Sequence, residues 1–582
     1  MYRIMSNNPF ENIGFGSKLR IDDLVLQSNE ANIPMKISFL GGINEVGKNL
    51  TVFEYGEDMI LLDCGLAFPD STLPGVDLVL PDFTYIEENA DRLKGIFITH
   101  AHEDHIGGLA YLLQKVHAPI YATLLAVNII ASKLEEHDVL STAVMHTIEP
   151  GDNVACGNFM VEAIHVNHSV PDAIAFAIRT DAGTIIHTGD FKIDFTPIDA
   201  DVIDLTRFAE ISKENVLCML ADSTNAERPG YTESEKIVGE TLYQLFQKAG
   251  NKRVIVATFA SNIHRIQQII STSEAMGRKV VLSGRSIENV VKIANELEYM
   301  NIKPGTLVEI DQINEYKDEQ LTIITTGSQG ETMSALTRMS TGMHRRIKIG
   351  PNDMIIISAT PIPGNEKTVD NVINDLIKLG AEVAYSKMYD VHVSGHACQE
   401  ELKLMLNLVK PKYYIPIHGE QKHLIANKKI AQSVGVPAEN IFVVNNGTSI
   451  EISEYGAFEV QDVPSGRVIV DGYGVGDIGN IVIRDRTQLG DEGVFIIGIA
   501  VEYNTLELIG EPIIESRGFT FVSENEEIYN EVIDLVKNIL KRGNFPGTNN
   551  LKSKIRDEVG RLIYNRIKRS PIIIPLIIDL DY

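Results

Sequence analysis

The chain has 582 residues, more than one hydrophobic core usually supports, so we expect about two or three domains. Its composition, 44% hydrophobic and 23% charged, is typical of globular proteins, and its aliphatic runs fall well short of the roughly 20 residues that a membrane span needs. The net charge of −27 argues against a protein that holds nucleic acid through a general positive field.

Residues 1–32 mix polar, charged and scattered apolar residues and lack the continuous apolar segment of a secretion signal. We expect a mobile N-terminal extension on a cytoplasmic protein without a membrane span. The four cysteines lie far apart and form no CxxC pair, which predicts neither a disulfide framework nor a thiolate zinc site.

From residue 33 onward the pattern predicts short strands closed by glycine or charge: KISFLGG, LTVFEY and MILLDCG. Further strands alternate with helical stretches, which is typical of a layered α/β fold. From about residue 230, helices and strands alternate regularly and predict a parallel, doubly wound sheet. A glycine-rich stretch, VPSGRVIVDGYGVGDIGN, then precedes a small third α/β unit.

The stretch FITHAHEDHIGG, residues 97–108, concentrates His100, His102, Asp104 and His105 directly after an apolar strand. In a loop at a strand end, side chains two positions apart point the same way, so His100 and His102 can close on one ion. Asp104 and His105 then reach a second point nearby. Imidazole and carboxylate groups in this arrangement indicate a divalent metal site.

Two metal ions need more ligands than these four residues supply. His168, Asp190 and His418 each follow an apolar strand, and Asp63 closes the strand MILLDCG. We expect Asp63 to orient a ligand histidine through its other ring nitrogen. Each of these residues alone would more often be structural, but together they complete two sites.

HAHEDH, with Asp63, His168 and Asp190, resembles the metallo-β-lactamase superfamily. Later motifs resemble its β-CASP branch and, within it, the bacterial ribonuclease J family: HTGDFKIDFTP, ADSTNAERPGYT, FASNIHRIQQ, HVSGHACQEELKLM, PIHGE, GVGDIGNIVIRDR and RSPIIIPLI. The resemblance covers nearly the whole chain after residue 33. It implies an αββα metallo-β-lactamase sandwich with an inserted β-CASP parallel-sheet domain and a small C-terminal α/β domain.

The implied domain boundaries place the β-CASP module inside the lactamase-like domain, which explains why His418 lies so far downstream. We expect a lactamase domain in two parts, residues 33–230 and 369–455, with the insertion at 231–368 between them. A linker at 456–470 then leads to a C-terminal domain at 471–582.

The resemblance implies that His100, His102 and His168 hold one zinc ion and that Asp104, His105 and His418 hold another, with Asp190 bridging. Manganese or magnesium are expected substitutes. Some members of the family also bind calcium through backbone carbonyls and an aspartate, and the residues aligned with that arrangement are Pro74, Val76 and Asp471.

Asp222 and His396 correspond to acidic and catalytic motifs of the branch, and both are candidates for transferring the proton to the leaving oxygen. Two segments correspond to RNA-binding motifs, with the residues Ser261, Asn262 and Ile263 in the first and His392, Val393, Ser394, Gly395 and His396 in the second. FAS ends a strand and NIHR opens a helix, so free amide groups at the helix start would face a phosphate.

These features predict a ribonuclease J-like dizinc nuclease with 5′-to-3′ exonuclease and endonuclease activity and a preference for 5′-monophosphate ends, acting in mRNA decay and rRNA maturation. We expect a homodimer or homotetramer, or assembly with a paralogous ribonuclease J subunit. The main alternative is a non-catalytic or weakly active RNA-binding subunit of a degradation complex, against which the complete ligand set argues.

Two rivals share the metal loop. Small-molecule hydrolases of the superfamily lack the second α/β module and HVSGHA, so the motifs after residue 220 argue against them. DNA-directed β-CASP nucleases tend to have valine at the position of His418, and the histidine therefore favours RNA.

Overall fold

A computed structural model describes residues 33–580 apart from 71, 199–200, 329–333, 362–364, 473, 503–504, 520–525 and 544. The expected N-terminal extension, residues 1–32, lies outside the described residues. The chain divides into two compact units, one formed by Met1–Ala67 with Leu80–Arg467 and the other by Phe68–Val79 with Val468–Tyr582.

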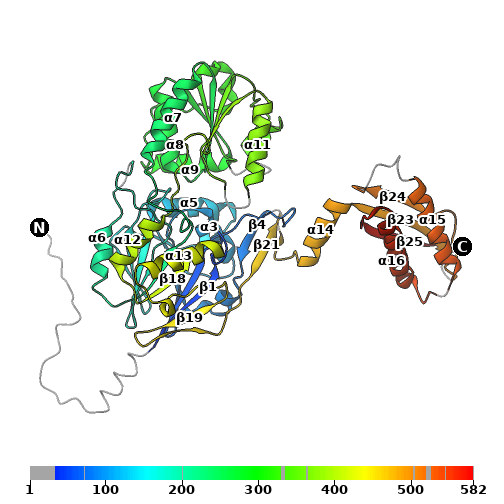
Figure 1. Ribbon diagram of the computed structural model, residues 1–582, viewed down its shortest axis with the longest axis horizontal. Coiled ribbons are helices and arrows are strands. Elements are labelled where there is room, and N and C mark those ends of the chain that lie inside the picture. Colours follow the sequence, from blue (N-terminus) through cyan, green and yellow to red (C-terminus); the bar gives the residue numbers. More distant parts are fainter. Residues whose placement is uncertain are drawn as a thin grey trace, which may run out of the picture. The chain divides into compact units, whose positions relative to one another are not determined.

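The larger part of the first unit contains two sheets (Figure 1). In the described residues the first sheet has the order β20(Ala457–Val460), β19(Ser449–Ile452), β1(Met35–Gly41), β2(Leu50–Tyr55), β3(Asp58–Leu62), β5(Leu93–Phe97), β6(Ile120–Ala122) and β7(Met145–Thr147). The second has the order β18(Tyr413–Ile417), β12(Val216–Asp222), β11(Gly183–His187), β10(Ile174–Thr180), β9(Phe159–His165) and β8(Asn153–Cys156).

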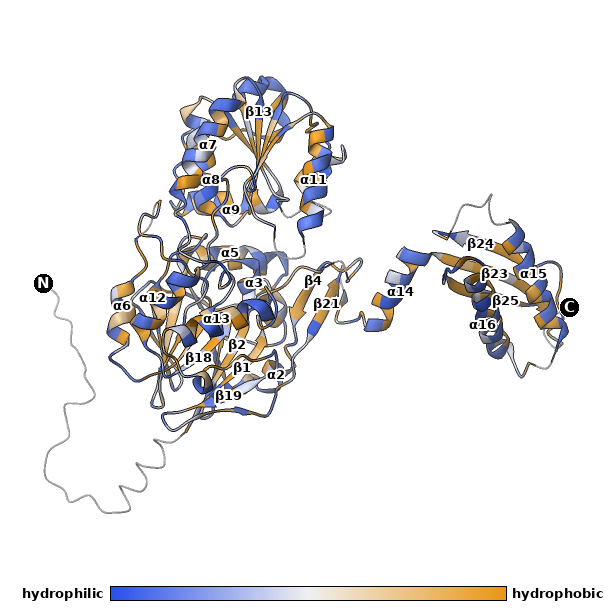
Figure 2. Ribbon diagram, viewed as in Figure 1, coloured by the Kyte–Doolittle hydropathy of each residue, from blue (hydrophilic) through white to orange (hydrophobic). Residues whose placement is uncertain are grey.

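Apolar side chains from both sheets form one core between them. Phe53, Ile60 and Phe97 of the first sheet and Phe176 and Leu220 of the second belong to the same buried cluster. Strands that are buried on both faces are almost continuously apolar, and β3 and β12 follow that pattern. Figure 2 shows the strands in orange at the centre of this domain.

Helices cover the outer faces of both sheets. A second buried cluster lies between the second sheet and three helices, α6(Leu205–Ile211), α12(Gln399–Val409) and α13(Gln421–Ser433). The helices that connect the strands of the first sheet are α2(Thr84–Glu88), α3(Glu103–Ile106), α4(Leu109–Leu112) and α5(Leu124–Glu136). The expected αββα sandwich is confirmed.

The inserted domain is built on a parallel sheet with the order β14(Lys279–Ser283), β15(Leu321–Thr325), β13(Arg253–Ala257), β16(Asp353–Ile357) and β17(Glu382–Tyr385). Its helices are α7(Lys236–Ala249), α8(Ile263–Ala275), α9(Arg285–Glu296), α10(Ala335–Ser340) and α11(Glu366–Lys378). The expected end of the insertion at residue 368 falls inside α11 and needs correction: β17 pairs in parallel with β16, so the insertion continues through Tyr385.

A short sheet of β22(Gly474–Val475), β21(Arg467–Asp471) and β4(Leu78–Pro81) has most of its residues in the second unit. The second unit also contains a sheet of β24(Ile513–Arg517), β23(Val494–Glu502) and β25(Ile572–Leu580). Its helices are α14(Asn480–Glu492), α15(Glu526–Lys541) and α16(Thr548–Ile567). Apolar side chains of β23, α15 and α16 form its core. The linker expected at 456–470 is partly sheet, because β20 pairs with β19.

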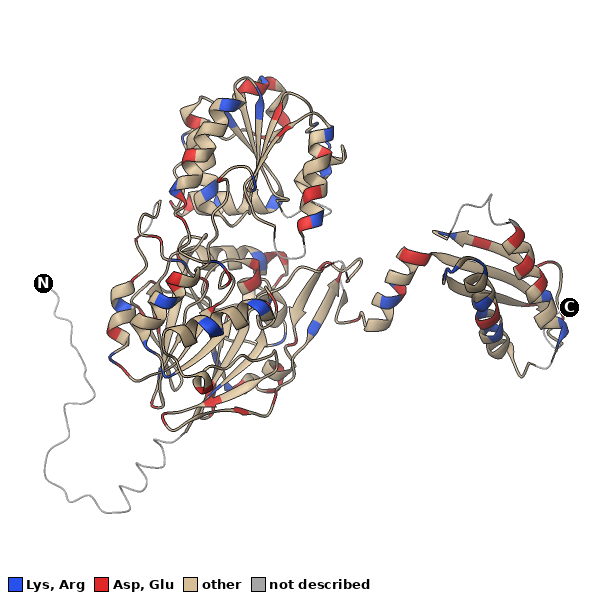
Figure 3. Cartoon of the chain, viewed as in Figure 1, with Lys and Arg blue, Asp and Glu red and all other residues tan. Residues whose placement is uncertain are grey.

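Charged side chains lie mainly on the helices and loops, and the strands carry few of them (Figure 3). Within the described part of the chain, no helix combines the length and the apolar character that crossing a membrane requires.

Candidate metal centre

The predicted metal ligands gather because most of them directly follow strands of the two facing sheets. His100 comes three residues after β5, His168 three residues after β9, and Asp190 three residues after β11, while His418 directly follows β18. Asp63 directly follows β3. These strand ends meet at one edge of the sandwich, so residues far apart in sequence lie within a few ångströms of one another.

The first cluster contains three imidazoles and one carboxylate. The distance from His102 Nδ1 is 2.9 Å to His100 Nε2 and 3.2 Å to His168 Nε2. Asp190 Oδ2 lies 3.8 Å from His100 Nε2 and 3.9 Å from His168 Nε2. Three nitrogen ligands and one carboxylate oxygen suit a zinc ion.

The second cluster shares Asp190. Its Oδ2 lies 3.3 Å from His105 Nε2 and 3.1 Å from His418 Nε2, and Asp104 Oδ2 lies 3.6 Å and 3.5 Å from the same two nitrogens. In each cluster the ligand atoms all lie within 4.8 Å of one another. The two sets of residues are those that the sequence predicts, and Asp190 lies where it can bridge them.

Asp63 holds His105 in place. Its Oδ2 accepts a 2.7 Å hydrogen bond from His105 Nδ1, which leaves Nε2 of that ring to face the cluster. Thr99 donates its backbone N–H to Asp63 Oδ1 at 2.8 Å. Asp63 and His418 have φ angles of 58° and 52°, conformations that non-glycine residues adopt at an energetic cost and that concentrate at functional sites.

The loop that carries His100 to His105 packs closely against the residues after β3. Cys64 donates its backbone N–H to His105 O at 2.8 Å, and Asn49 donates to Asp104 O at 2.9 Å. A Cβ atom on Gly65 would lie 1.6 Å from Asp104 O, so only glycine permits this approach. Backbone contacts therefore fix the position of this loop.

Burial and charge divide the histidines into two groups. Burial lowers the pKa of His100 well below its usual value and lowers that of His102 to about 4, so both rings are neutral and ready to bind a cation. Burial would also lower the pKa of His418, but Asp190 and Asp104 outweigh it and raise that pKa to about 10. The carboxylates likewise hold the pKa of His105 well above its usual range. Ligands bind a metal in their deprotonated forms, so a cation bound here would lower both of these pKa values.

Next to the clusters, His396 and Asp222 form a pair. His396 Nδ1 donates to Asp222 Oδ2 at 2.7 Å, and Asp222 Oδ1 accepts from the N–H and hydroxyl of Thr224. Burial opposes the charge on His396, but Asp222 and Asp190 outweigh it and raise the pKa of that imidazole. Among the described residues none hydrogen-bonds His396 Nε2, so this nitrogen is left for an exogenous group.

The first predicted RNA-binding segment lies at the start of α8. Asn262 caps this helix, with its side chain accepting a 3.0 Å hydrogen bond from Arg265 N. The Asn262 side chain is therefore committed to the helix. The backbone N–H groups of Asn262 and Ile263 are engaged as well, donating to Phe259 O at 3.2 Å and to Ser261 O at 2.9 Å. Phosphate binding by this segment stays a prediction.

The second predicted segment, residues 392–396, contacts the metal centre directly. Gly395 O accepts a 2.8 Å hydrogen bond from His168 Nδ1, and a Cβ atom on Gly395 would lie 2.6 Å from that ring. Ser394 Oγ accepts from Asn225 Nδ2 at 2.9 Å, which leaves its own hydrogen free to donate. Burial and the nearby Arg265 lower the pKa of His392 to about 3, so this ring is neutral.

Two of the three residues predicted to bind calcium, Pro74 and Asp471, meet in the second unit, but around a guanidinium. Arg486 Nη1 donates to Pro74 O at 3.3 Å and to Gly75 O at 3.1 Å, and its Nη2 pairs with the Asp471 carboxylate. As arranged, these oxygens fit an arginine, and calcium would have to displace it. Calcium binding here stays a prediction.

Sequence reasoning missed two residues of the centre. Thr99 supports Asp63 and lies 3.0 Å from His100 Nδ1, and Asn49 Nδ2 lies 3.1 Å from His105 Nε2. Thr99 directly precedes the histidine motif and could have been noticed there. Asn49 ends the stretch LGGINEVGKN, residues 40–49, which is part of the family resemblance, but the resemblance gave this residue no role at the centre.

Four family models match successive parts of the chain. They are the β-lactamase superfamily domain at residues 58–210, the ribonuclease J β-CASP domain at 251–376, the Zn-dependent metallo-hydrolase RNA specificity domain at 380–443 and the ribonuclease J C-terminal domain at 481–580. The chain is 39% identical to ribonuclease J 1 of Streptococcus pyogenes, covering 93% of this chain and 97% of the relative. It belongs to the ribonuclease J family.

Other ribonuclease J proteins match over similar lengths. The chain is 38% identical to ribonuclease J2 of Bacillus subtilis, covering 95% of this chain and all of the relative, and 41% identical to ribonuclease J of Thermus thermophilus, covering 93% and 94%. A crystal structure of a protein of unknown function from Enterococcus faecalis shares the fold, with a TM-score of 0.51 at 18% identity over 72% of this chain and all of that one. As a member of the ribonuclease J family, the protein is a metal-dependent ribonuclease.

Proposed function

We propose that the two clusters hold two zinc ions and that the protein hydrolyses RNA phosphodiester bonds at this centre. The RNA would lie between the clusters and the inserted domain. The observation that carries this is the pair of four-ligand clusters sharing Asp190, with the His396–Asp222 pair beside it. When bound, the two metal ions supply Lewis-acid chemistry, neutralising charge on the phosphate under in-line attack by water.

The protein's own side chains then supply the proton that the leaving oxygen takes up. Attack at phosphorus with cleavage of the P–O3′ bond leaves a 5′-phosphate on one product and a 3′-hydroxyl on the other. His396, whose pKa is raised, donates the proton to the leaving 3′ oxygen through Nε2. Asp222 is occupied by His396 and Thr224, so its part is to orient the imidazole and stabilise its charge.

A preference for a 5′-monophosphate follows from the groups beside the clusters. The Ser394 hydroxyl accepts from Asn225 and keeps its own hydrogen to donate, and the start of α8 presents the positive end of its helix dipole. We assign both to the terminal phosphate. The protein then acts as a 5′-to-3′ exonuclease and as an endonuclease, in mRNA decay and rRNA maturation in the cytoplasm, as a homodimer, a homotetramer or with a paralogous subunit.

Cleavage of one labelled RNA, prepared with a 5′-monophosphate or a 5′-triphosphate, tests the proposal. We expect faster turnover of the monophosphate, mononucleotide products alongside internal cuts, and loss of both activities with a chelator. Metal analysis should give about two zinc ions per chain. Equal rates on both RNAs would contradict the end preference, and one metal per chain would contradict the dizinc centre.

A non-catalytic or weakly active RNA-binding subunit is the second candidate. It predicts RNA binding without turnover in the metal-loaded protein. The complete ligand set and the His396–Asp222 pair argue for an active enzyme, because a binding subunit has no need of either.

A further inference from the structure

A fully buried arginine lies where the inserted domain joins the lactamase domain. Arg265, on the first turn of α8, is 0% exposed, and the side chain of its partner Glu235 is 5% exposed. Charged side chains are almost never buried to this extent unless they are paired, because desolvation costs several kcal/mol for each ion. The position therefore calls for an explanation beyond packing.

Every N–H group of this guanidinium has a partner. Nη2 donates to both oxygens of Glu235 at 2.8 and 2.7 Å, and Nε donates to Glu235 Oε2 at 3.3 Å. Nη1 donates to Ser358 Oγ at 2.6 Å and to Val391 O at 2.9 Å. Ser358 Oγ in turn donates to Val391 O at 2.6 Å. Arg265 thus joins α8, the end of β16 and two further chain segments.

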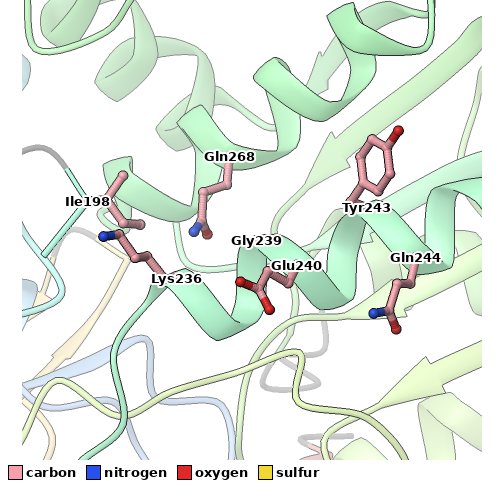
Figure 4. Close-up of a pocket in the computed structure, with 7 residues that line it drawn as sticks. All are labelled: Ile198, Lys236, Gly239, Glu240, Tyr243, Gln244 and Gln268. Carbon is pink, nitrogen blue, oxygen red and sulfur yellow. The ribbon is translucent and has the colours of Figure 1, made fainter. Parts of the chain in front are cut away.

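Those two segments are the places where the chain passes between the domains. The entry segment, residues 231–235, leads into α7, and the return segment, residues 391–396, leads back toward α12. The segments lie side by side, since Thr232 Oγ1 donates to His396 O at 2.6 Å. Gln268 of α8 adds a 2.9 Å bond to Glu235 O, and Figure 4 shows it close above Gly239 of α7.

Both segments continue directly to the metal centre. In the return segment, Gly395 O accepts from His168 Nδ1, and His396 pairs with Asp222. In the entry segment, Glu233 O accepts a 3.2 Å bond from Lys192, which lies two residues after Asp190. The guanidinium of Arg265 therefore fixes both chain segments. The return segment reaches the metal ligand His168 and contains the proton donor His396, and the entry segment reaches the residues next to the shared ligand Asp190.

We infer that Arg265 is a positioning residue for RNA cleavage: it holds the return segment, and with it His396 and the RNA-facing residues around Ser394, in register with the metal centre. The inference rests on the proposed function of that centre. Arg265 itself touches no metal ligand and takes no part in the chemistry.

Lysine cannot replace Arg265 in this role. A single ammonium group has no planar set of donors that could serve Glu235, Ser358 and Val391 together. With Arg265→Lys, Val391 O loses its charged donor, and the return segment shifts relative to the clusters. A displacement of about 1 Å at reacting groups can cost about 100-fold in rate.

The inserted domain offers a matched control. Arg278, which lies between α8 and β14, is 5% exposed and donates to the carbonyl oxygens of Lys252, Leu321 and Gly250 at 3.0, 3.1 and 3.0 Å. It is buried and multiply bonded like Arg265, but its partners lie at the opposite, amino-terminal end of the sheet. Replacing Arg278 destabilises the same domain without touching the entry segment or the return segment.

The experiment compares Arg265→Lys, the milder Ser358→Ala and Arg278→Lys in the full, zinc-loaded chain. Each is measured on a 5′-monophosphorylated RNA and on bis(p-nitrophenyl) phosphate, a small diester that needs neither the inserted domain nor a proton donor for its leaving group. Zinc content, the melting temperature and amide hydrogen exchange over residues 388–397 are measured as well.

We expect Arg265→Lys to lower kcat on RNA by about 100-fold and to speed exchange in the return segment, with zinc content and hydrolysis of the small diester unchanged. Ser358→Ala should follow in the same direction with a smaller loss. Arg278→Lys should lower the melting temperature and leave RNA turnover within about threefold of the wild type.

Equal losses on RNA and on the small diester for Arg265→Lys, or an RNA defect as large in Arg278→Lys, would overturn the inference and make Arg265 merely structural. Failure of the proposed function looks different. In that case the wild-type protein itself, fully loaded with zinc, would hydrolyse the small diester and leave RNA intact.

Discussion

His168 Nδ1 donates a 2.8 Å hydrogen bond to the carbonyl oxygen of Gly395, and this bond joins a predicted metal ligand to the segment that returns from the inserted domain. Because a carbonyl oxygen only accepts, the proton is on Nδ1, and Nε2 is the nitrogen that faces His102 and Asp190. The segment that returns from the inserted domain therefore helps to set the tautomer of a residue in the metal centre.

The same logic applies to Asp63, which accepts from His105 Nδ1. Asp63→Asn replaces a carboxylate acceptor with a neutral amide, and we expect zinc affinity and RNA turnover each to fall by about 10–100-fold. Zinc content after dialysis against graded chelator measures the first. Asp58→Asn is the matched control, since Asp58 begins β3 and bonds Asn158 N away from the centre. Wild-type zinc affinity in Asp63→Asn would refute this role.

Removal of the proton donor should depend on the leaving group. His396→Ala should slow RNA cleavage by about 100- to 10,000-fold. In an RNA with sulfur in place of the bridging 3′ oxygen, the leaving group is a thiolate that needs no proton. The loss of rate on this substrate should therefore be much smaller. Rates on the two substrates, measured at saturating concentration, check this. A loss of equal size on both would show that His396 does not donate the proton.

Asp190 should matter more than any ligand that serves one cluster, because its Oδ2 belongs to both. We expect about two metal ions per chain in the wild type, about one after His418→Ala and less than one after Asp190→Asn, with no measurable RNA turnover in the last. Circular dichroism should show an intact fold, since the core lies between the sheets and away from these side chains. Retention of both ions by Asp190→Asn would exclude its bridging position.

Most of the metal centre could be predicted because its pattern is local. His100 to His105 lie within six positions after an apolar strand, and the remaining ligands each follow a strand. The inserted domain was predicted for the same reason, since helix and strand periods alternate plainly after residue 230. The predicted end at residue 368 is wrong because α11 and β17 continue the same alternation of helix and strand. The sequence does not show which sheet β17 joins, and its pairing with β16 does.

Contacts between distant residues could not be predicted in this way. Arg265 meets Val391 across 126 positions, and Arg486 meets Pro74 across 412. A basic residue on a helix normally indicates a solvated face, and nothing in the surrounding sequence marks Arg265 as buried. Likewise, Pro74 and Asp471 come together as the resemblance implies, yet the arginine between them belongs to a helix that sequence reasoning left unassigned.

The buried Arg265–Glu235 pair makes stability depend on pH. Burial raises the pKa of Glu235, but Arg265 and Lys192 outweigh it and lower that pKa below the ordinary value of 4.5. A carboxylate with a lowered folded-state pKa stabilises the fold above the unfolded-state value, and this contribution is lost as pH falls through the folded-state value.

At neutral pH, Glu235→Gln leaves Arg265 buried and unpaired and should cost about 3–5 kcal/mol of unfolding free energy. The gap between wild type and variant should close as pH falls below 4.5. Urea unfolding at graded pH measures this gap. Glu240→Gln, an exposed position on α7, the helix that follows Glu235, is the control expected to match the wild type throughout. A gap that stays constant down to acid pH would mean that Glu235 is not charged in the folded protein.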